Sequence, residues 1–227
     1  ENFPRNSLIR GFNGGLRFTY LLNSVDEFNY GVTFLGFRTD YRFTNSFGLI
    51  TEQIFNNTEA AADFSYKTVI RRINGAVRDS IKDIAVIEPG LRLHYYNDHS
   101  FISVEPRIRA KINLPRVSFT FGAGTLSQNL MAAVSDRDVV NLFQGFLAAP
   151  TNLDGRIKDH ALQTANHLLA GAEVEVLPTL STRLEGWYKD FTQLTNINRT
   201  KLFPEDPDFI TETGYARGAD LILRYES

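Results

Sequence analysis

Four charged residues occupy every second position of the stretch 103–112. They are Glu105, Arg107, Arg109 and Lys111, and the positions between them carry Val104, Pro106, Ile108, Ala110 and Ile112. A period of two places alternate side chains on opposite faces of a β-strand. The charged face could contact an anionic substrate or a partner domain, but the simpler interpretation is a solvated wall. Because the opposite face is wholly aliphatic, we interpret the stretch as a strand between lipid and a water-filled lumen.

Other groups of reactive residues lack the spacing of a reaction centre. Glu173 and Glu175 share one strand face, but a general acid–base pair also needs a cleft and a perturbed environment. The histidines lack metal-ligand spacing and are expected at the surface, two of them near one rim; they are His94, His99, His160 and His167. The glycines at 122–124 lack the lysine and serine of a phosphate loop. We therefore expect no enzyme, no cofactor and no metal.

The composition narrows the class of protein further. The chain has 227 residues, a net charge of -2 and no cysteine, which argues against nucleic-acid binding, a disulfide framework and a cysteine nucleophile. It contains no apolar run of about 18 residues and so no transmembrane helix, whereas a barrel strand needs only about 9–11 residues. Glu1 does not begin a signal peptide. We expect 1–227 to be a mature or internal segment of one β domain.

Alternation like that of 103–112 recurs and predicts about nine antiparallel strands. We expect them at 16–22, 30–38, 60–69, 87–95, 103–112, 117–124, 167–177, 183–189 and 218–225. Short turns are expected at 23–26, 97–100, 113–116 and 177–180, and loops at 1–14, 39–58, 126–166 and 190–213. For 39–58 the alternative is that the flanking strands extend into it beyond the membrane. The stretch 71–83 fits a hairpin that extends its flanking strands. Residues 135–143 fit one or two helical turns, and Pro89 and Pro106 are expected at bulges or rims.

Charged residues recur on the polar faces of these strands. Those expected to face the lumen are Arg92, Glu105, Arg107, Arg109, Lys111, Glu173, Glu175, Arg183, Glu185, Asp220 and Arg224. Tyrosines fall on the apolar faces, often near strand ends, at Tyr20, Tyr30, Tyr66, Tyr95, Tyr188 and Tyr225. Such placement is typical of the aromatic girdles of membrane barrels. Short turns that tend to alternate with long loops are typical of the two ends of a bacterial outer-membrane barrel.

Six stretches resemble the barrel of a TonB-dependent outer-membrane receptor of the Bacteroidota type. They are IEPGLRL at 87–93, EPR at 105–107, GTLSQNL at 124–130, SDRDVVNLF at 135–143, EGWYKDF at 185–191 and GYARGAD at 214–220. Their order and spacing carry the resemblance, which covers most of the chain from about residue 28 onward.

The resemblance implies a barrel of roughly 22 strands, filled by an N-terminal plug domain, in the outer membrane of a Gram-negative cell. It also implies import of a scarce nutrient, such as a siderophore, vitamin, glycan or peptide, driven through TonB by the inner-membrane proton gradient. The partners would be outer-membrane lipid, the plug and the TonB system. Whether a surface lipoprotein is also a partner stays open. This chain departs from the pattern in having no plug and no TonB box, so we expect it to be part of the barrel wall.

The loop 126–166 is where contacts with substrate or a partner are expected. Its candidates are Asp136, Arg137, Asp138, Phe143 and Phe146. The alternative is that Val139, Val140, Leu142 and Phe143 pack the loop on itself. Two rival functions stay open for the whole chain, a soluble all-β binding or adhesion module and a passive outer-membrane porin. The identity of the substrate and the oligomeric state do not follow from the sequence.

Overall fold

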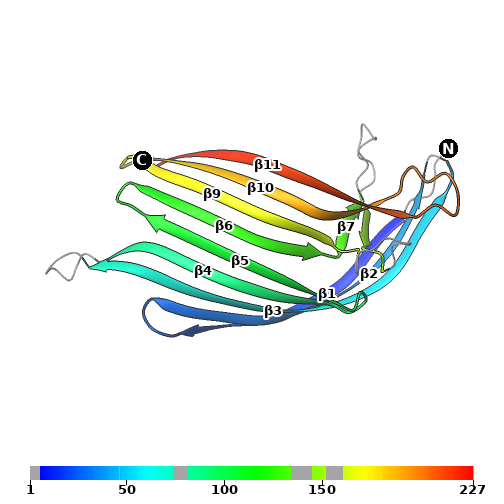
Figure 1. The fold of residues 1–227 in the computed structure, drawn as a ribbon, viewed down its shortest axis with the longest axis horizontal. Coiled ribbons are helices and arrows are strands. Elements are labelled where there is room, and N and C mark those ends of the chain that lie inside the picture. Colours follow the sequence, from blue (N-terminus) through cyan, green and yellow to red (C-terminus); the bar gives the residue numbers. More distant parts are fainter. Residues whose placement is uncertain (1–5, 46, 74–80, 134–144, 152–160, 227) are drawn as a thin grey trace.

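The computed structural model describes residues 6–45, 47–73, 81–133, 145–151 and 161–226. Nine strands form one antiparallel sheet, in which successive strands are neighbours and β9 lies beside β6 (Figure 1). They are β1 (Asn6–Leu21), β2 (Asp26–Thr44), β3 (Ile50–Ile73), β4 (Ile81–Tyr96), β5 (Phe101–Asn113), β6 (Val117–Gln128), β9 (Gln163–Leu177), β10 (Leu180–Ile197) and β11 (Phe209–Tyr225). Two short strands, β7 (Leu130–Ala133) and β8 (Gly145–Ala148), form a separate hairpin. The described ranges hold no helix that is long and apolar enough to cross a membrane.

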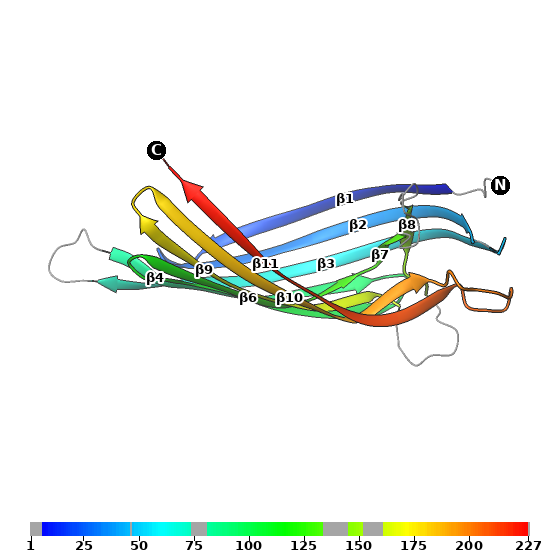
Figure 2. The same cartoon turned by 90° about the horizontal axis from the view of Figure 1, so that it is seen from above.

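The sheet is open, with β1 and β11 as its two edges. Its strands are long and curve around a concave side, as the two perpendicular views show (Figure 2). The prediction of an all-β chain with an antiparallel sheet is therefore confirmed, whereas these residues do not close into a barrel.

The connections differ between the two ends of the strands. At one end, which we call the turn end, the connections 22–25, 114–116 and 178–179 are short. At the other end, the loop end, the connections 45–49 and 97–100 are short, but 129–162 and 198–208 are long. The predicted extension of 71–83 into its flanking strands is confirmed, because β3 reaches Ile73 and β4 begins at Ile81.

Several strands are longer than the hydropathy pattern predicts. The expected loop at 1–14 is wrong in large part, because β1 begins at Asn6. Within 39–58 the strand extensions are confirmed, because β2 continues to Thr44 and β3 begins at Ile50. The expected loop at 190–213 shrinks to 198–208, and the region 126–166 contains β7 and β8. Near the loop end the outer positions of β2 become polar while Tyr41 and Phe43 on its inner face are buried, so pairing continues beyond the apolar part of the outer face. The helical turns expected at 135–143 lie outside the described residues.

Pro89 and Pro106 lie inside the sheet, and each interrupts the pairing of its strand with only one of the two neighbouring strands. The register between β4 and β5 runs without a shift past Pro89 and Pro106, so the expected bulges are wrong for this pair of strands. On the other side of β4, the β3 ladder skips the positions beside Pro89. On the other side of β5, pairing with β6 ends at Arg107, next to Pro106. Proline has no N–H to donate, which explains why both gaps adjoin a proline.

The two faces of the sheet differ sharply in chemistry. One face, which we call the outer face, exposes a large apolar side chain from every strand: Phe18, Val32, Phe64, Leu93, Val104, Phe121, Leu168, Leu184 and Leu221. The opposite or inner face carries most of the charged side chains of the strands. Directly paired residues share a face, so the registers extend each face across the whole sheet.

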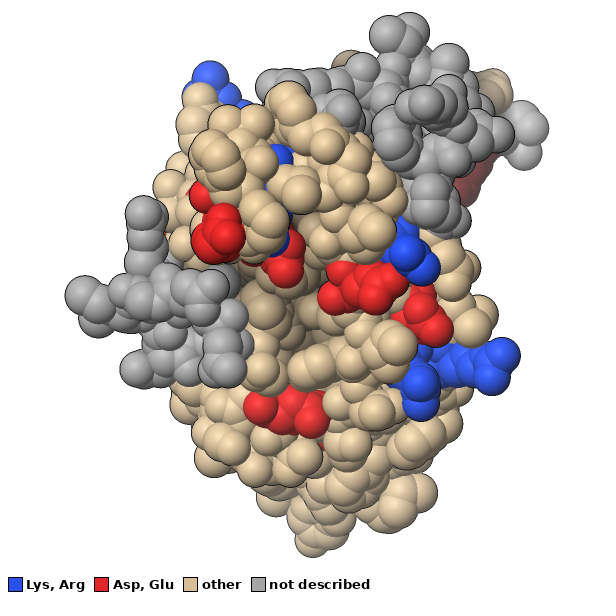
Figure 3. Space-filling view, turned by 90° about the vertical axis from the view of Figure 1, so that its right-hand side faces the viewer, with Lys and Arg blue, Asp and Glu red and all other residues tan. Residues whose placement is uncertain are grey.

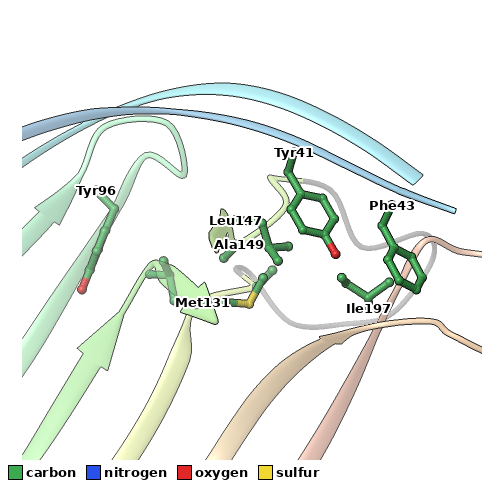
Figure 4. Close-up of a cluster of buried hydrophobic side chains, with 9 residues drawn as sticks. Tyr41, Phe43, Tyr96, Met131, Leu147, Ala149 and Ile197 are labelled. Carbon is green, nitrogen blue, oxygen red and sulfur yellow. The ribbon is translucent and has the colours of Figure 1, made fainter. Parts of the chain in front are cut away.

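The hairpin β7–β8 packs on the inner face at the loop end and forms the main apolar cluster there. The cluster consists of Tyr41, Phe43, Tyr96, Met131, Leu147, Ala149, Ala161, Leu162 and Ile197 (Figure 4). The Gln53 side chain fixes β8 with two hydrogen bonds of 2.8 Å, donating to the carbonyl of Ala148 and accepting from its N–H. The Asn129 Oδ1 atom accepts from the N–H of Ala149 at 2.9 Å. The long connection between β6 and β9 is thereby folded against the inner face.

Candidate functional site

The inner face gathers the residues that the sequence predicts to face a lumen. Arg92 is paired in register with Glu105, Arg183 with Glu173, and Glu185 with Asp220. The other predicted residues follow at alternate positions on the same strands, namely Arg107, Arg109, Lys111, Glu175 and Arg224. Alternation within each strand and pairing between strands thus place the whole set on one face.

Three ionisable side chains are buried together near the loop end of this face. The His94 Nε2 atom lies 2.9 Å from Oε2 of Glu59, and His94 Nδ1 lies 3.7 Å from Oε1 of Glu105. Asn57 donates from Nδ2 to the other Glu59 oxygen at 2.6 Å. Glu105 is only 2% exposed and His94 only 8%. The imidazole therefore joins β3 to β5 through two carboxylates, and the expectation that His94 is a surface residue is wrong.

Glu105 also bridges the place where β5 and β6 separate. Its Oε1 atom accepts hydrogen bonds from the backbone N–H of Ser127 at 3.2 Å and from the Ser127 hydroxyl at 2.5 Å. The Tyr96 hydroxyl lies 2.8 Å from the same Ser127 oxygen. Because the ladder between β5 and β6 ends at Arg107, the carboxylate provides an acceptor that the backbone no longer supplies. Glu105 therefore also links β5 to β6 by hydrogen bonds.

Arginines surround this centre on the side toward the turn end. Arg107 Nη2 lies 3.6 Å from Asp63 Oδ1 and 3.9 Å from Glu105 Oε2, and Arg92 Nη1 lies 3.9 Å from Asp63. Farther along, Arg109 Nη2 donates to both Glu88 oxygens at 2.9 Å, with the Arg109 side chain largely exposed. Around this centre the charges of the inner face are thus matched by opposite charges on neighbouring strands.

A hollow of about 610 Å³ lies over this part of the inner face. Its charged residues and its histidine are Arg17, Asp63, Glu88, Arg107, Arg109 and His167. Gly90 and Gly124 leave room for the Arg107 side chain, since a Cβ at either position would lie 3.1–3.2 Å from it. The hollow can accept polar groups of either sign, and its donors and acceptors are set on rigid strands.

The inner face offers groups for hydrogen bonding and ion pairing. Glu173 and Glu175 lie toward the turn end, where Glu173 is opposite Arg183 and Glu175 is opposite Ser181. Arg183 also contacts Glu185 on its own strand. Across the part of the chain that the structure describes, no group of three or more His, Cys, Asp or Glu side chains is placed to hold a metal ion.

The loop candidates fall mostly outside the described ranges, which exclude Asp136, Arg137, Asp138 and Phe143. Phe146 is described in β8, where its N–H donates to the Ser7 hydroxyl at 2.9 Å and its side chain is 36% exposed. At the loop end, acidic and basic side chains lie in small separate groups on uncharged surface (Figure 3). The hydrogen bond to Ser7, a residue of β1, positions Phe146 at this end.

The loop 198–208 meets the connection between β2 and β3 at the loop end. Asn45 donates from Nδ2 to the carbonyl of Lys201 at 3.0 Å, and Lys201 Nζ lies 3.1 Å from Asp208. Within the loop, Asp206 accepts from the N–H groups of Phe203 and Leu202, each at 2.9 Å. These two backbone donors hold the pKa of Asp206 below its usual value.

The sequence pattern did not identify Glu59, the carboxylate that pairs with His94. Glu59 lies one residue outside the expected strand 60–69, at a position that continues the alternation of Asn57, Ala61 and Asp63. His94 and His99 both lie near the loop end, with the Tyr96 ring centroid 4.1 Å from His94 and 6.4 Å from His99. Extending the period of two past the apolar positions would have included Glu59.

Comparisons with protein families, with curated proteins and with solved structures find no match to this chain.

Proposed function

We propose that this chain forms part of the wall of an outer-membrane β-barrel, and that the barrel is a TonB-dependent transporter importing a scarce nutrient. The observation that carries the proposal is the contrast between the faces. All nine strands expose large apolar side chains outward, while the inner face buries Glu59, His94 and Glu105. A soluble β domain packs its apolar face inside and hydrates its charges. Lipid outside and protein or water inside satisfy both faces of this sheet.

The connections and the edges of the sheet support the same assignment. Three of the four connections at the turn end are two to four residues long, and the two long connections lie at the loop end. Outer-membrane barrels have short periplasmic turns and longer extracellular loops, so we assign the loop end to the cell surface. The edges β1 and β11 offer backbone donors and acceptors over their length. Further strands of a larger barrel would satisfy them.

Four of the six stretches that carry the family resemblance are paired with one another in the sheet. In β4 and β5, Leu91 is opposite Pro106 and Arg92 is opposite Glu105. In β10 and β11, the stretch 185–191 runs opposite 214–220, from Glu185 beside Asp220 to Phe191 beside Gly214. Residues that are distant in the sequence thus form two compact strand pairs. This arrangement supports treating them as structural signatures of the TonB-dependent class.

The transporter function assigns a role to each surface of the chain. The outer face contacts outer-membrane lipid, and the inner face contacts the plug domain and the passing substrate. The loop end receives the substrate, alone or from a surface lipoprotein, and TonB acts through the plug of the full-length protein. No residue of the chain is assigned a catalytic or cofactor-binding role.

The test uses the full-length protein, expressed with an outer-membrane signal in a Gram-negative host. We expect extraction only with detergent and a folded form that migrates differently from the boiled form on a denaturing gel. A product that is folded and soluble without detergent would overturn the proposal in favour of a soluble module. In planar bilayers a plugged transporter is closed, so spontaneous steady conductance would instead identify a passive porin.

A further inference from the structure

An apolar groove of about 750 Å³ lies on the outer face, across β5, β6, β9 and β10. Its larger walls are Ile108, Phe121, Leu168 and Tyr188, and Arg217 of β11 lies at one end of it. Its floor consists of outward-facing Ala110, Ala123, Ala170 and Gly186. A depression of this size between bulky neighbours can hold an elongated apolar molecule against the sheet.

The height of the groove along the strands follows from the residues on either side of it. One row of paired outward positions is polar, namely Thr125, Asn166 and Asp190, and the Thr125 hydroxyl donates to Asn166 Oδ1 at 2.9 Å. The next row toward the turn end is Ala123, Leu168, Tyr188 and Arg217. On β6, β9 and β10 the outer face therefore changes from polar to apolar between these rows, and Arg217 of β11 is paired with Tyr188 in the first apolar row.

The Arg217 guanidinium lies beside the ring of Tyr215. Its guanidinium carbon lies 5.9 Å from the centroid of Tyr215, and Tyr215 stacks on Tyr188 with centroids 6.2 Å apart. The structure describes no ion pair between Arg217 and a carboxylate. The positive charge at the end of the groove is therefore available to an anion, and a guanidinium matches the oxygens of a phosphate in charge and geometry.

We propose that the groove binds one acyl chain of a phosphate-bearing membrane lipid, whose phosphate lies against Arg217. The inference rests on the proposed function, because it requires the outer face to lie in lipid. It goes further by naming one lipid site on that face. The polar row above the groove would lie at headgroup level, and the apolar walls below it would contact the chain.

The experiment is native mass spectrometry of the full-length protein in detergent, titrated in separate arms with phosphatidylglycerol, diacylglycerol of the same chains and inorganic phosphate. We expect one phosphatidylglycerol molecule to be retained, and neither diacylglycerol nor phosphate to be retained comparably. Arg217→Gln should weaken phosphatidylglycerol binding about tenfold through loss of a charge-assisted hydrogen bond. Ala170→Phe should abolish retention by filling the groove.

Matched variants on the same outer face serve as controls. Arg38→Gln removes an outward arginine of β2, and Ala62→Phe enlarges an outward alanine of β3, both far from the groove in strand order. Neither should change lipid retention. Equal retention of diacylglycerol and no effect of Arg217→Gln would overturn the inference. A heat-modifiable barrel that retains no lipid would overturn it while leaving the proposed function intact, and a soluble product would overturn both.

Discussion

The two ends of the inner face follow the same alternation but differ in burial. At the loop end, Thr39 and Tyr96 have no exposed surface and Glu105 is almost fully buried. At the turn end, Lys111 and Glu175 are exposed on the same face of neighbouring parts of the sheet. The difference comes from the hairpin β7–β8 and the loop 198–208, which cover only the loop end. Burial of a charge here is decided by the long connections rather than by the strands that carry it.

The largest expected contrast between the ends comes from removing a carboxylate. Glu105→Ala leaves His94 Nδ1 and Ser127 without their buried carboxylate partner, so we expect the free energy of unfolding to fall by about 3–5 kcal/mol. Glu175→Ala, in an exposed position, should change it by less than about 0.5 kcal/mol. Denaturant titrations of the full-length protein in lipid vesicles measure both. Equal losses would show that the two ends are energetically alike.

Truncation of the apolar cluster tests whether the hairpin is a packed part of the fold. Leu147, in β8, is 1% exposed, whereas Leu177 at the turn end is 56% exposed. Leu147→Ala should lower the free energy of unfolding by about 2–4 kcal/mol because it opens a cavity. Leu177→Ala should have a much smaller effect in the same denaturant titration. A negligible effect of Leu147→Ala would mean that the hairpin does not contribute to stability.

The hydrogen bonds between Gln53 of β3 and Ala148 of β8 should contribute less to stability, and two substitutions of Gln53 can remove them to different extents. Gln53→Ala removes both hydrogen bonds to Ala148, and we expect local opening to become easier by about 1–2 kcal/mol. Gln53→Glu retains an acceptor for the Ala148 N–H but loses the donor, and should give an intermediate effect. Hydrogen exchange of the Ala148 amide reports the change. Unaltered protection in both variants would contradict the attachment.

The smallest effect concerns the order of the loop 198–208. Folding lowers the pKa of Asp206, so its contribution is present at neutral pH and is lost as the pH falls through that lowered pKa. Exchange protection of the Leu202 and Phe203 amides should decrease in the same pH range. Asp206→Asn should reduce protection already at neutral pH, whereas Glu205→Gln should not. Protection that is independent of pH in the unaltered protein would refute this role.

The period of two in the sequence is enough to predict the strands and their faces. The stretch 103–112 matches β5, which runs from Phe101 to Asn113, and the charged positions share one face as expected. The extra length of β2 was not predictable from an apolar outer face, because its last outward positions carry Arg38, Asp40 and Arg42, while Tyr41 and Phe43 face inward and join the apolar cluster. There the backbone ladder and the inward apolar cluster keep the strands together.

The candidate site could be predicted only in outline. Alternation identifies Glu105 and Arg107 as neighbours on one face, but it does not distinguish the buried Glu105 from the exposed Lys111. That distinction depends on Tyr96, Leu147 and the other residues that cover the loop end, and they come from distant parts of the chain. The proline positions show the same limit, because the effect of a missing N–H depends on which neighbour it faces.

The order of strands in the sheet determines whether a closed antiparallel ring would need an odd or an even number of strands. Neighbouring strands all run in opposite directions, so the first and the last of the nine, β1 and β11, run in the same direction. Joining these two edges directly would create a parallel pair in an otherwise antiparallel sheet. An antiparallel ring can form only if an odd number of additional strands is inserted between them, whichever polypeptide supplies those strands. The total is then even, as in bacterial single-chain barrels.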